Sequence, residues 1–508
     1  MTSLRRGALL AAWVAATAAW VVPPAHAQDE ATEDEDAEEQ PRDERIRYVV
    51  ERVVIRGNRT TRDRVIRRYV PIRAGDVLDV EDPAVELIRY RLLGTGWFRD
   101  VRLALARGSR RGRVILRVEV EERNTLVVQG VSVGLSSDVS ATADENADLS
   151  AYGAVDVGET NLLGLGVSLS AAAAISERQQ GYRLRYSDRA FAGSQASLNA
   201  TLLFNDARDY FGDRDVRATS CAGEEVEGAS AVVAYTRAGG VFGTGLDLGV
   251  STRLELGYRL ELLDASLPCA ASRTRGPDDT DAEVVPIDFG ILRGRSVLSG
   301  LTLDLSFDRR DVPALPSRGI FVRFTADAFS NLLGSDYDFA RLQVAASGWL
   351  RLPWGHVLEV RGFLGAVLGR APFFFRFFVG DQSDLIPNRI LDLTFDRRPA
   401  PDFLGTAVAE MRYEDLAGSV GLEYRMRLHR SGNPGAAIYG VDAYLGVGLY
   451  ALGSRSDIRL APAGYVGLSR IPLDLTFDLG LKADTSLGVF RFGLSNLIGF
   501  FPFSQRDL

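Results

Sequence analysis

The sequence has few of the residues that build catalytic and metal sites. It contains two cysteines and three histidines, and His26 lies close to the N-terminus. His356 and His429 each lack a second histidine or cysteine at the spacing of zinc ligands. No G-x-S-x-G, P-loop or H-E-x-x-H motif occurs. The sequence therefore predicts neither a metal nor a cofactor, and it does not support an enzyme.

Long apolar runs are missing beyond the first residues. No later stretch approaches the roughly 20 apolar residues that a membrane-spanning helix needs. The one apolar run, Ala8 to Val22, follows Arg5 and Arg6 and precedes the small-residue motif Ala25-His26-Ala27. This arrangement is typical of a secretory signal peptide over residues 1–27, so the chain is predicted to be exported. Any insertion into a membrane must then use strands.

Positive charge is not in excess either. The net charge is −8, and Lys482 is the only lysine. An acidic balance does not favour binding to a phosphate backbone, so no nucleic-acid partner is predicted. Residues 28–46 form an acidic tract with too little hydrophobicity for a core. We expect a disordered linker there, and an interaction tail is the alternative.

Alternation of apolar and polar residues fills most of the chain after about residue 125. In Leu473 to Gly480 every odd position is apolar and every even position is polar or glycine. Residues 196–204, 301–308 and 422–428 follow the same alternation. A strand turns alternate side chains to opposite faces. Because so many charged residues fill the second face, the pattern predicts a transmembrane β-barrel over residues 124–503, apolar outward and polar inward.

The segments of this kind predict sixteen antiparallel strands, an even number as expected for a bacterial single-chain barrel. They lie near residues 125–135, 150–158, 165–175, 180–188, 195–205, 229–239, 246–260, 293–308, 319–328, 337–351, 356–368, 418–429, 438–450, 463–471, 473–481 and 488–499. The longest connection, about 369–417, is the sixth external loop, and a loop of that length is usually functional. Cys221 and Cys269 fall in the third and fourth external loops. A disulfide between them is predicted for an oxidising compartment, and two free thiols are the alternative.

Residues 47–123 have the pattern of a small α+β domain. The expected elements are a strand over 49–55, a helix capped by Thr60 or Thr61 and ending at Tyr69, a helix over 83–93, and a hairpin of 98–106 with 114–121. The order is β-α-α-β-β. This order, with the segments VVIRGNRTTRDRVIRRYVPIRAGDVLD, LLGTGWFRDVRLAL and VILRVEVEER, resembles a POTRA domain.

POTRA domains precede barrels of the BamA/TamA-like outer-membrane family, and the barrel region is similar to that family as well. Residues 161–166 (NLLGLG) resemble its first periplasmic turn, and residues 308–319 resemble a later one. The resemblance implies a mainly β chain in a Gram-negative-type outer membrane, with a single POTRA domain in the periplasm.

In that family the sixth loop folds back into the lumen and carries an Arg-Gly-aromatic motif after a Phe-Phe-x-Gly-Gly segment. Here Asp381 replaces the second glycine, and no Arg-Gly follows. The literal match at residues 360–363 lies inside a predicted strand, so we interpret it as a coincidence. The resemblance implies Arg389 as the substitute, paired with Asp442. The alternative is that Asp442 and Glu423 simply face water.

The resemblance also implies a function in assembling or translocating other proteins. Unfolded client polypeptides, above all other outer-membrane proteins, would add a strand to the POTRA sheet edge. The barrel would close at a lateral seam between its first strand, with Val127 and Val128, and its last, with Phe490 and Phe492. Outer-membrane lipid and accessory periplasmic or lipoprotein subunits are the other implied partners. A two-partner-type secretion pore, a passive pore or surface scaffold, and soluble β-domains are the alternatives.

Overall fold

The computed structural model describes residues 47–79, 83–137, 149–211, 216–219, 231–249, 251–275, 283–313, 315–378, 389–395, 413–431, 436–453 and 473–499. The chain from Arg47 onward forms one compact unit. The predicted signal peptide (1–27) and acidic linker (28–46) lie outside the described residues. Among the helices that the structure describes, none has the length and apolar character that a membrane crossing requires.

The N-terminal domain has the predicted α+β architecture, with one short strand added. Its elements are β1 (Arg47–Arg56), α2 (Asp63–Arg67), β2 (Val77–Asp79), α3 (Pro83–Gly94), β3 (Phe98–Arg107) and β4 (Arg113–Glu122). The sheet order is β2-β1-β4-β3, with β1 parallel to β4. Alternate residues of β4 from Val114 to Val120 are buried against α2 and α3, where Ile66, Ile88 and Leu92 fill the core. The predicted cap at Thr60 or Thr61 is wrong, because α2 begins after Arg62, which makes no side-chain cap.

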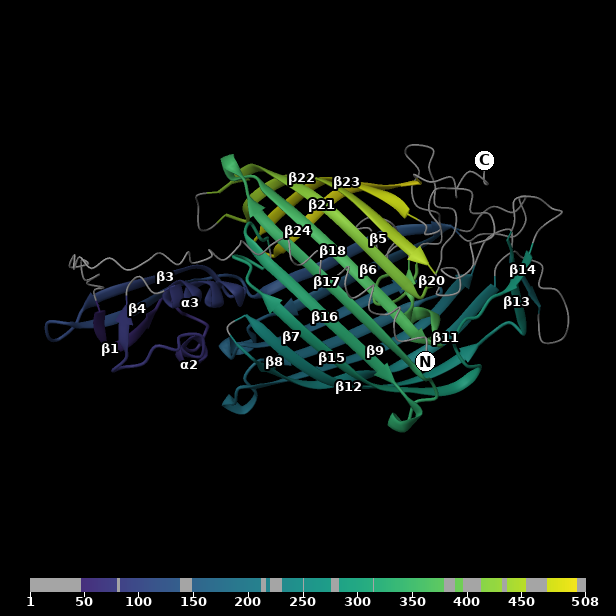
Figure 1. The fold of residues 1–508 in the computed structure, drawn as a ribbon, viewed down its shortest axis with the longest axis horizontal. Coiled ribbons are helices and arrows are strands. Elements are labelled where there is room, and N and C mark those ends of the chain that lie inside the picture. The colour runs from purple at the N-terminus through teal and green to yellow at the C-terminus, as the bar shows by residue number, and fades with distance from the viewer. Residues whose placement is uncertain are drawn as a thin grey trace, which may run out of the picture. The chain divides into compact units, whose positions relative to one another are not determined.

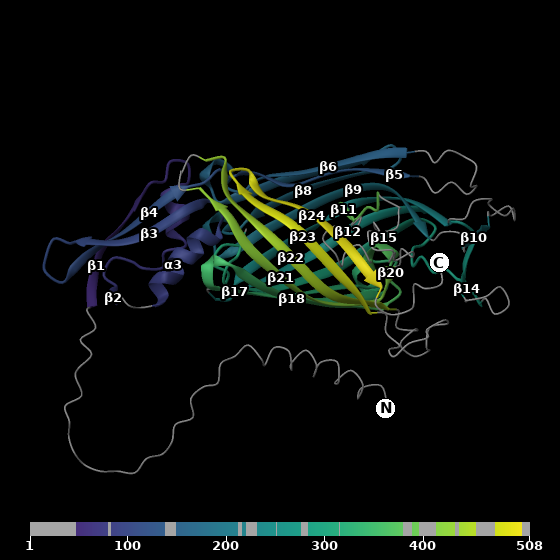
Figure 2. The same cartoon turned by 90° about the horizontal axis from the view of Figure 1, so that it is seen from above.

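The rest of the described chain is dominated by one antiparallel sheet of fifteen strands, drawn in Figures 1 and 2 as tilted ribbons that wrap around a lumen. Its strands are β5 (Leu126–Ser137), β6 (Leu149–Glu159), β7 (Val167–Ser176), β8 (Gln180–Asp188), β9 (Ala196–Phe211), β11 (Ala231–Asp247), β12 (Thr252–Ser266), β15 (Gly294–Asp308), β16 (Gly319–Phe329), β17 (Phe339–Arg351), β18 (Val357–Gly369), β21 (Leu416–Arg430), β22 (Ile438–Gly453), β23 (Leu473–Thr485) and β24 (Gly488–Gly499). Each strand pairs with its sequence neighbour in this series. The predicted barrel architecture is confirmed.

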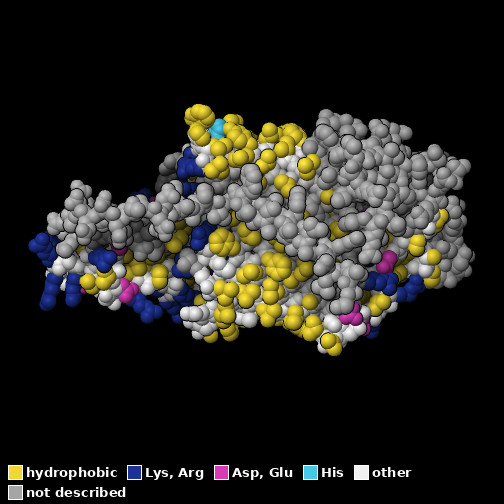
Figure 3. Space-filling model, in the orientation of Figure 1, with side chains coloured by type: hydrophobic (Ala, Val, Ile, Leu, Met, Phe, Trp, Pro, Cys, Tyr) yellow, Lys and Arg dark blue, Asp and Glu magenta, His cyan; other side chains and the backbone are white. Residues whose placement is uncertain are grey.

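The alternation of the strands separates an apolar outer face from a charged lumen. On β12, Leu256, Tyr258, Leu260 and Leu262 are exposed, whereas Glu261 is fully buried. Figure 3 shows hydrophobic side chains covering much of the outer wall of the strands. On β23, Leu479 and Leu481 face outward and the Asp478 carboxylate faces inward, as the sequence pattern predicts.

Two details of the predicted strands do not match the described sheet. The segment 463–471, expected as a strand, lies outside the described residues, and β22 pairs directly with β23. The expected break between 239 and 246 is wrong, because β11 runs unbroken to Asp247. Several glycines lie in this part of β11. They lie where neighbouring backbone comes close: a Cβ on Gly239 would be 2.2 Å from the Leu260 carbonyl oxygen.

Shorter elements lie in the external loops. The strands β10 (Val216–Thr219), β13 (Ala270–Arg275) and β14 (Glu283–Pro286) form a small sheet, and β19 (Phe377–Phe378) pairs with β20 (Tyr413–Glu414) in the sixth loop. Cys269 lies between β12 and β13, and Cys221 lies outside the described residues, so their pairing stays a prediction. A core of aromatic and aliphatic side chains fills the lumen where the sixth loop enters it.

Candidate functional site

The sixth loop begins with a short 3-10 turn, η6 (Phe373–Phe375), whose three rings are buried inside the barrel. Phe373 packs edge-on against Phe211 of β9, with ring centroids 4.9 Å apart. Phe374 stacks on Tyr235 of β11 at 5.5 Å, and Phe375 lies between Phe329 and Phe339 at 5.0 and 5.2 Å. We call these three residues the aromatic stem. Because the stem contacts strands β9, β11, β16 and β17, it fills the lumen at the external end.

A buried ion network supports the stem from the wall. Arg237 of β11 forms a bidentate pair with Glu261 of β12, and Arg259 binds the same carboxylate at 2.6 Å. The Arg237 guanidinium also lies over the Phe374 ring, 4.8 Å from its centroid. Desolvated pairs of this kind are stable only when their hydrogen bonds are satisfied, so the network fixes the geometry of this wall.

The sixth loop returns to the wall as a second contact, the tip at residues 389–395. Ile390 and Leu393 form a bridge, and the Asp392 carboxylate lies 3.3 Å from Arg183 of β8 and 3.4 Å from Arg237. The backbone is held as well, because Asn205 donates its amide to the Leu391 carbonyl at 2.9 Å. The tip therefore has polar and charged contacts to strands β8, β9 and β11.

The structure does not bring Arg389 next to Asp442. Arg389 donates to the Phe374 carbonyl at 2.9 Å, whereas Asp442 pairs with Arg430 at 2.6 Å and with Arg425 at 3.3 Å. The physical reason is position. The tip rests on β8, β9 and β11, whereas Asp442 lies near the start of β22 and beside β21. The sequence could have revealed the acid at 392, but no pattern marks Arg183 and Arg237 as its partners.

Glu423 does not simply face water. Its side chain is buried and accepts from Lys482 of β23 and from Arg491 of β24, the latter at 3.3 Å. The Arg-Gly-Phe match at residues 360–363 lies within β18, where Arg361 reaches Asp478 of β23 at 3.5 Å. Luminal charges thus link the wall strands to the last two strands of the sheet.

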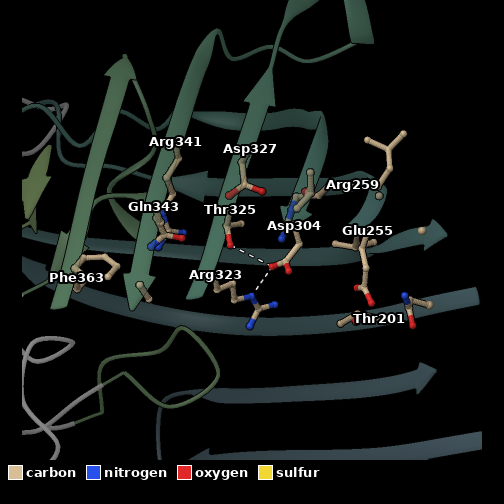
Figure 4. A pocket seen from close by; sticks show the side chains of 17 residues that line it. Thr201, Glu255, Arg259, Asp304, Arg323, Thr325, Asp327, Arg341, Gln343 and Phe363 are labelled. Atoms are coloured by element: carbon tan, nitrogen blue, oxygen red, sulfur yellow. Dashed lines mark hydrogen bonds and ion pairs between the residues drawn. The ribbon is translucent and has the colours of Figure 1, made fainter. Parts of the chain in front are cut away.

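A polar cavity of about 490 Å³ opens in the lumen beside these networks. It is lined mainly by strands β9, β12, β15, β16 and β17, and Figure 4 shows Arg323 and Thr325 turned toward Asp304. Asp327 in the same wall is buried. Carboxylates and guanidiniums alternate around this cavity, so it has the mixed charge of a wet barrel interior. The residues that the structure describes contain no cluster able to hold a metal ion.

The predicted lateral seam lies between β5 and β24, which are the two edges of the described sheet. Within the described residues no ladder joins these two strands. They meet at one end, where the Val128 amide donates to the Leu487 carbonyl at 2.9 Å and Asn124 donates to the Ser486 carbonyl at 3.0 Å. Val127 and Phe490 are half-buried, and Phe492 is 62% exposed on the outer face. The assigned role of these residues in a gate stays a prediction.

A set of buried contacts, which we call the periplasmic joint, fastens the N-terminal domain to the first barrel turn. The Asn161 amide donates to the Thr61 hydroxyl at 2.8 Å, and both side chains are buried. The Trp97 indole donates to the Thr160 carbonyl at 2.8 Å. Its ring lies so close to Gly166 that a Cβ there would be 2.9 Å away. Sequence reasoning marked residues 161–166 as a family turn but missed their contact with Thr61 and Trp97.

Glu122, the last residue of β4, completes the joint from the other side. Its carboxylate accepts the backbone N–H groups of Arg59, Thr60 and Thr61, at 3.0, 2.9 and 2.6 Å. Burial raises the pKa of Glu122, but these donors outweigh burial and bring its pKa below the usual value. Arg123, the next residue, contacts Asp484 and the Thr485 carbonyl at the far side of the seam. The domain thus contacts the turn after β6 on one side of the seam and the end of β23 on the other.

Known protein families match both the barrel and the N-terminal domain. The model of the Omp85 superfamily domain matches residues 161–385, and the POTRA model, described as a surface antigen variable number repeat, matches residues 48–123. These residues are similar to the Omp85 superfamily, and the predicted resemblance to the BamA/TamA-like outer-membrane family is confirmed. The barrel of this chain therefore lies in the outer membrane and its POTRA domain in the periplasm, as predicted. The superfamily also confirms the prediction that the chain is not an enzyme.

Individual relatives are distant. The outer membrane protein assembly factor BamA of Nitratidesulfovibrio vulgaris is 26% identical over 347 residues, which cover 66% of this chain and 37% of that protein. The match thus spans little more than a third of the relative. CdiB from Escherichia coli has a TM-score of 0.50 at 12% identity, covering 88% of this chain and 73% of that one. BamA from Haemophilus ducreyi lacking POTRA domains 1–3 has a TM-score of 0.46 at 16% identity, covering 90% and 82%.

Proposed function

We propose that the chain assembles or translocates other polypeptides in the outer membrane, and that its POTRA domain receives them unfolded. The observation that carries this proposal is the periplasmic joint together with the Arg123 contact, which hold the POTRA domain against the turn after β6 and the end of β23, each next to an edge strand of the sheet. A client bound to that domain is thereby delivered where β5 and β24 lack a ladder. Accessory periplasmic or lipoprotein subunits belong to the same proposal.

The POTRA sheet offers an edge for such a client. In the described domain β3 is the outer strand, and it pairs only with β4. The Val101 carbonyl accepts from the Arg89 side chain at 2.9 Å, so the backbone of Val101 faces away from β4. Backbone groups alternate sides along a strand, and Leu103 and Leu105 therefore turn their N–H groups to the open edge. Added strands bind through such main-chain groups with little dependence on sequence.

The aromatic stem argues against a passive pore. A diffusion channel needs a continuous aqueous path, whereas three buried phenylalanines fill the external end of this lumen. The described lumen keeps a polar cavity, and buried aromatic and aliphatic side chains pack where the sixth loop enters it. A plugged barrel whose edge strands share no ladder within the described residues suits insertion or regulated passage better than free diffusion.

A reconstitution experiment tests the proposal. The full chain in proteoliposomes is given a urea-unfolded outer-membrane protein, and folding is followed by heat-modifiable migration on a gel. We expect faster folding than in empty liposomes, and Leu105→Pro removes the effect because it deletes one edge donor while edge positions tolerate proline. Leu105→Thr keeps the N–H group and serves as the matched control.

The outcomes separate the alternatives. If the chain leaves client folding unchanged but protects a client inside the vesicle from external protease, the two-partner-type secretion pore is favoured. A large steady conductance without either activity supports the passive pore. Equal activity of Leu105→Pro and Leu105→Thr contradicts the edge as the client site.

A further inference from the structure

The tip of the sixth loop has an unusual backbone. Leu391 and Asp392 both have positive φ, 52° and 68°, in the two central positions of a tight turn between Ile390 and Leu393. Turns of this geometry favour Asn-Gly, and left-handed backbone costs other residues roughly 1–2 kcal/mol each. Leucine and aspartate keep this conformation only because the surroundings hold it.

The wall offers a socket that fits the tip. Leu393 is fully buried, and a Cβ on Gly181 of β8 would lie 2.8 Å from its Cδ1 atom. Gln179 donates to the Thr394 carbonyl at 3.0 Å, and Phe395 stacks on Tyr152 of β6 with ring centroids 5.6 Å apart. A leucine therefore fills the space left by a glycine, and a backbone carbonyl meets a buried amide.

Charge complements the shape of this socket. Asp392 enters between Arg183 and Arg237, which come from different strands and share one oxygen of its carboxylate. The acid thus comes from the loop and the bases come from the wall. This polarity is the reverse of the predicted pair, in which a loop arginine would bind a wall aspartate.

The two anchors of the loop differ in burial. The rings of the aromatic stem are at most 4% exposed, whereas the Asp392 side chain is 43% exposed and its contacts are longer than 3.2 Å. Partly exposed ion pairs are weak, and the strained turn lowers the net stability of the tip further. The stem is therefore the permanent anchor, and the tip is the contact that can be released.

We propose that residues 390–393 form a latch of reversed polarity, in which Asp392 docks between Arg183 and Arg237 and holds the tip of the sixth loop, residues 389–395, against the lumen wall. Release of the latch widens the lumen while the aromatic stem stays in place. The proposal concerns the loop alone and stands whether or not the POTRA domain receives clients.

Charge reversal tests the latch in planar bilayers with the full chain. Asp392→Arg places three like charges together, and we expect roughly fivefold more open-channel events than in the unchanged chain, in keeping with a partly exposed ion pair. The double variant Asp392→Arg with Arg183→Asp restores the attraction and returns the closed behaviour. Asp264→Asn, which removes an exposed carboxylate that pairs with Arg295, leaves conductance unchanged.

A second variant tests the socket without altering charge. Gly181→Leu occupies the space of Leu393 and displaces the tip, so it increases open-channel events as Asp392→Arg does. Heat-modifiable migration verifies that each barrel is folded. Unchanged conductance in the folded Asp392→Arg and Gly181→Leu barrels overturns the latch, as does a double variant that stays as open as Asp392→Arg alone.

Discussion

At the scale of single residues, Glu122 shows how one carboxylate can organise a joint. Its oxygens accept three successive backbone N–H groups in the loop that precedes α2. Thr61 in the same loop accepts a hydrogen bond from the Asn161 amide. Because the folded pKa of Glu122 is depressed, its contribution is complete above the unfolded value near ~4.3 and is lost as pH falls through the folded pKa.

Glu122→Gln is therefore expected to lower the thermal stability of the full chain at neutral pH and to flatten its loss of stability in acid. The reason is that glutamine is uncharged at every pH and accepts the three donors less strongly. Scanning fluorimetry between about pH 3 and 7 measures both effects, a range that brackets the carboxyl titration. Glu119→Gln, an exposed change on the same strand, is the control. A Glu122→Gln protein with the original pH profile would contradict this role.

The candidate pairs show what a sequence can reveal at this scale. Alternation placed Glu423 and Asp478 in the lumen, and the structure confirms both. The partners of these carboxylates could not be predicted. A pair such as Glu423 with Arg491 joins residues that are 68 positions apart in the sequence, and it depends on the strand register. Asp392 is visible in the sequence as an acid in the sixth loop, but its docked position was not predictable, since it depends on a tight turn that its sequence disfavours.

At the scale of elements, the aromatic stem is the firmest part of the sixth loop. Phe373 is fully buried and contacts rings from β9, β11 and β20. Phe373→Ala leaves a cavity that the surrounding strands cannot close, so it should cost about 3–5 kcal/mol of unfolding free energy. Urea unfolding in detergent measures the loss. Leu332→Ala, at a side chain that is 96% exposed in a turn, should change the free energy little.

Elements were predictable where one local rule governs them. The two-residue period of the strands follows from a wall with lipid on one face and water on the other, and it located twelve of the fifteen described barrel strands to within a few residues. The boundary between β11 and β12 was misplaced, because glycine signals a turn locally but also permits close strand contacts. The cap of α2 was misplaced because a barrel residue, Asn161, engages the predicted capping residue Thr61.

At the scale of the whole molecule, the periplasmic joint connects the POTRA domain to the first barrel turn. The joint buries a side-chain hydrogen bond between Asn161 and Thr61, and a close backbone contact supports it, since a Cβ on Gly164 would lie 1.9 Å from the Thr60 carbonyl oxygen. A buried bond of this kind contributes about 1 kcal/mol, and more is lost when one partner remains unsatisfied. The orientation of the POTRA domain therefore depends on the first barrel turn.

Asn161→Leu is expected to uncouple the domains without unfolding either. Spin labels at Arg110 in the POTRA hairpin and at Leu332 outside the barrel, in a chain with Cys221 and Cys269 replaced by serine, report the distance between them. The unchanged joint should give a narrow distribution and Asn161→Leu a broad one, because the Thr61 hydroxyl loses its buried partner. Leu163→Ala, exposed in the same turn, should stay narrow. If Asn161→Leu also stays narrow, the other contacts of the joint suffice to orient the domain, and the coupling of clients to the seam no longer rests on this bond.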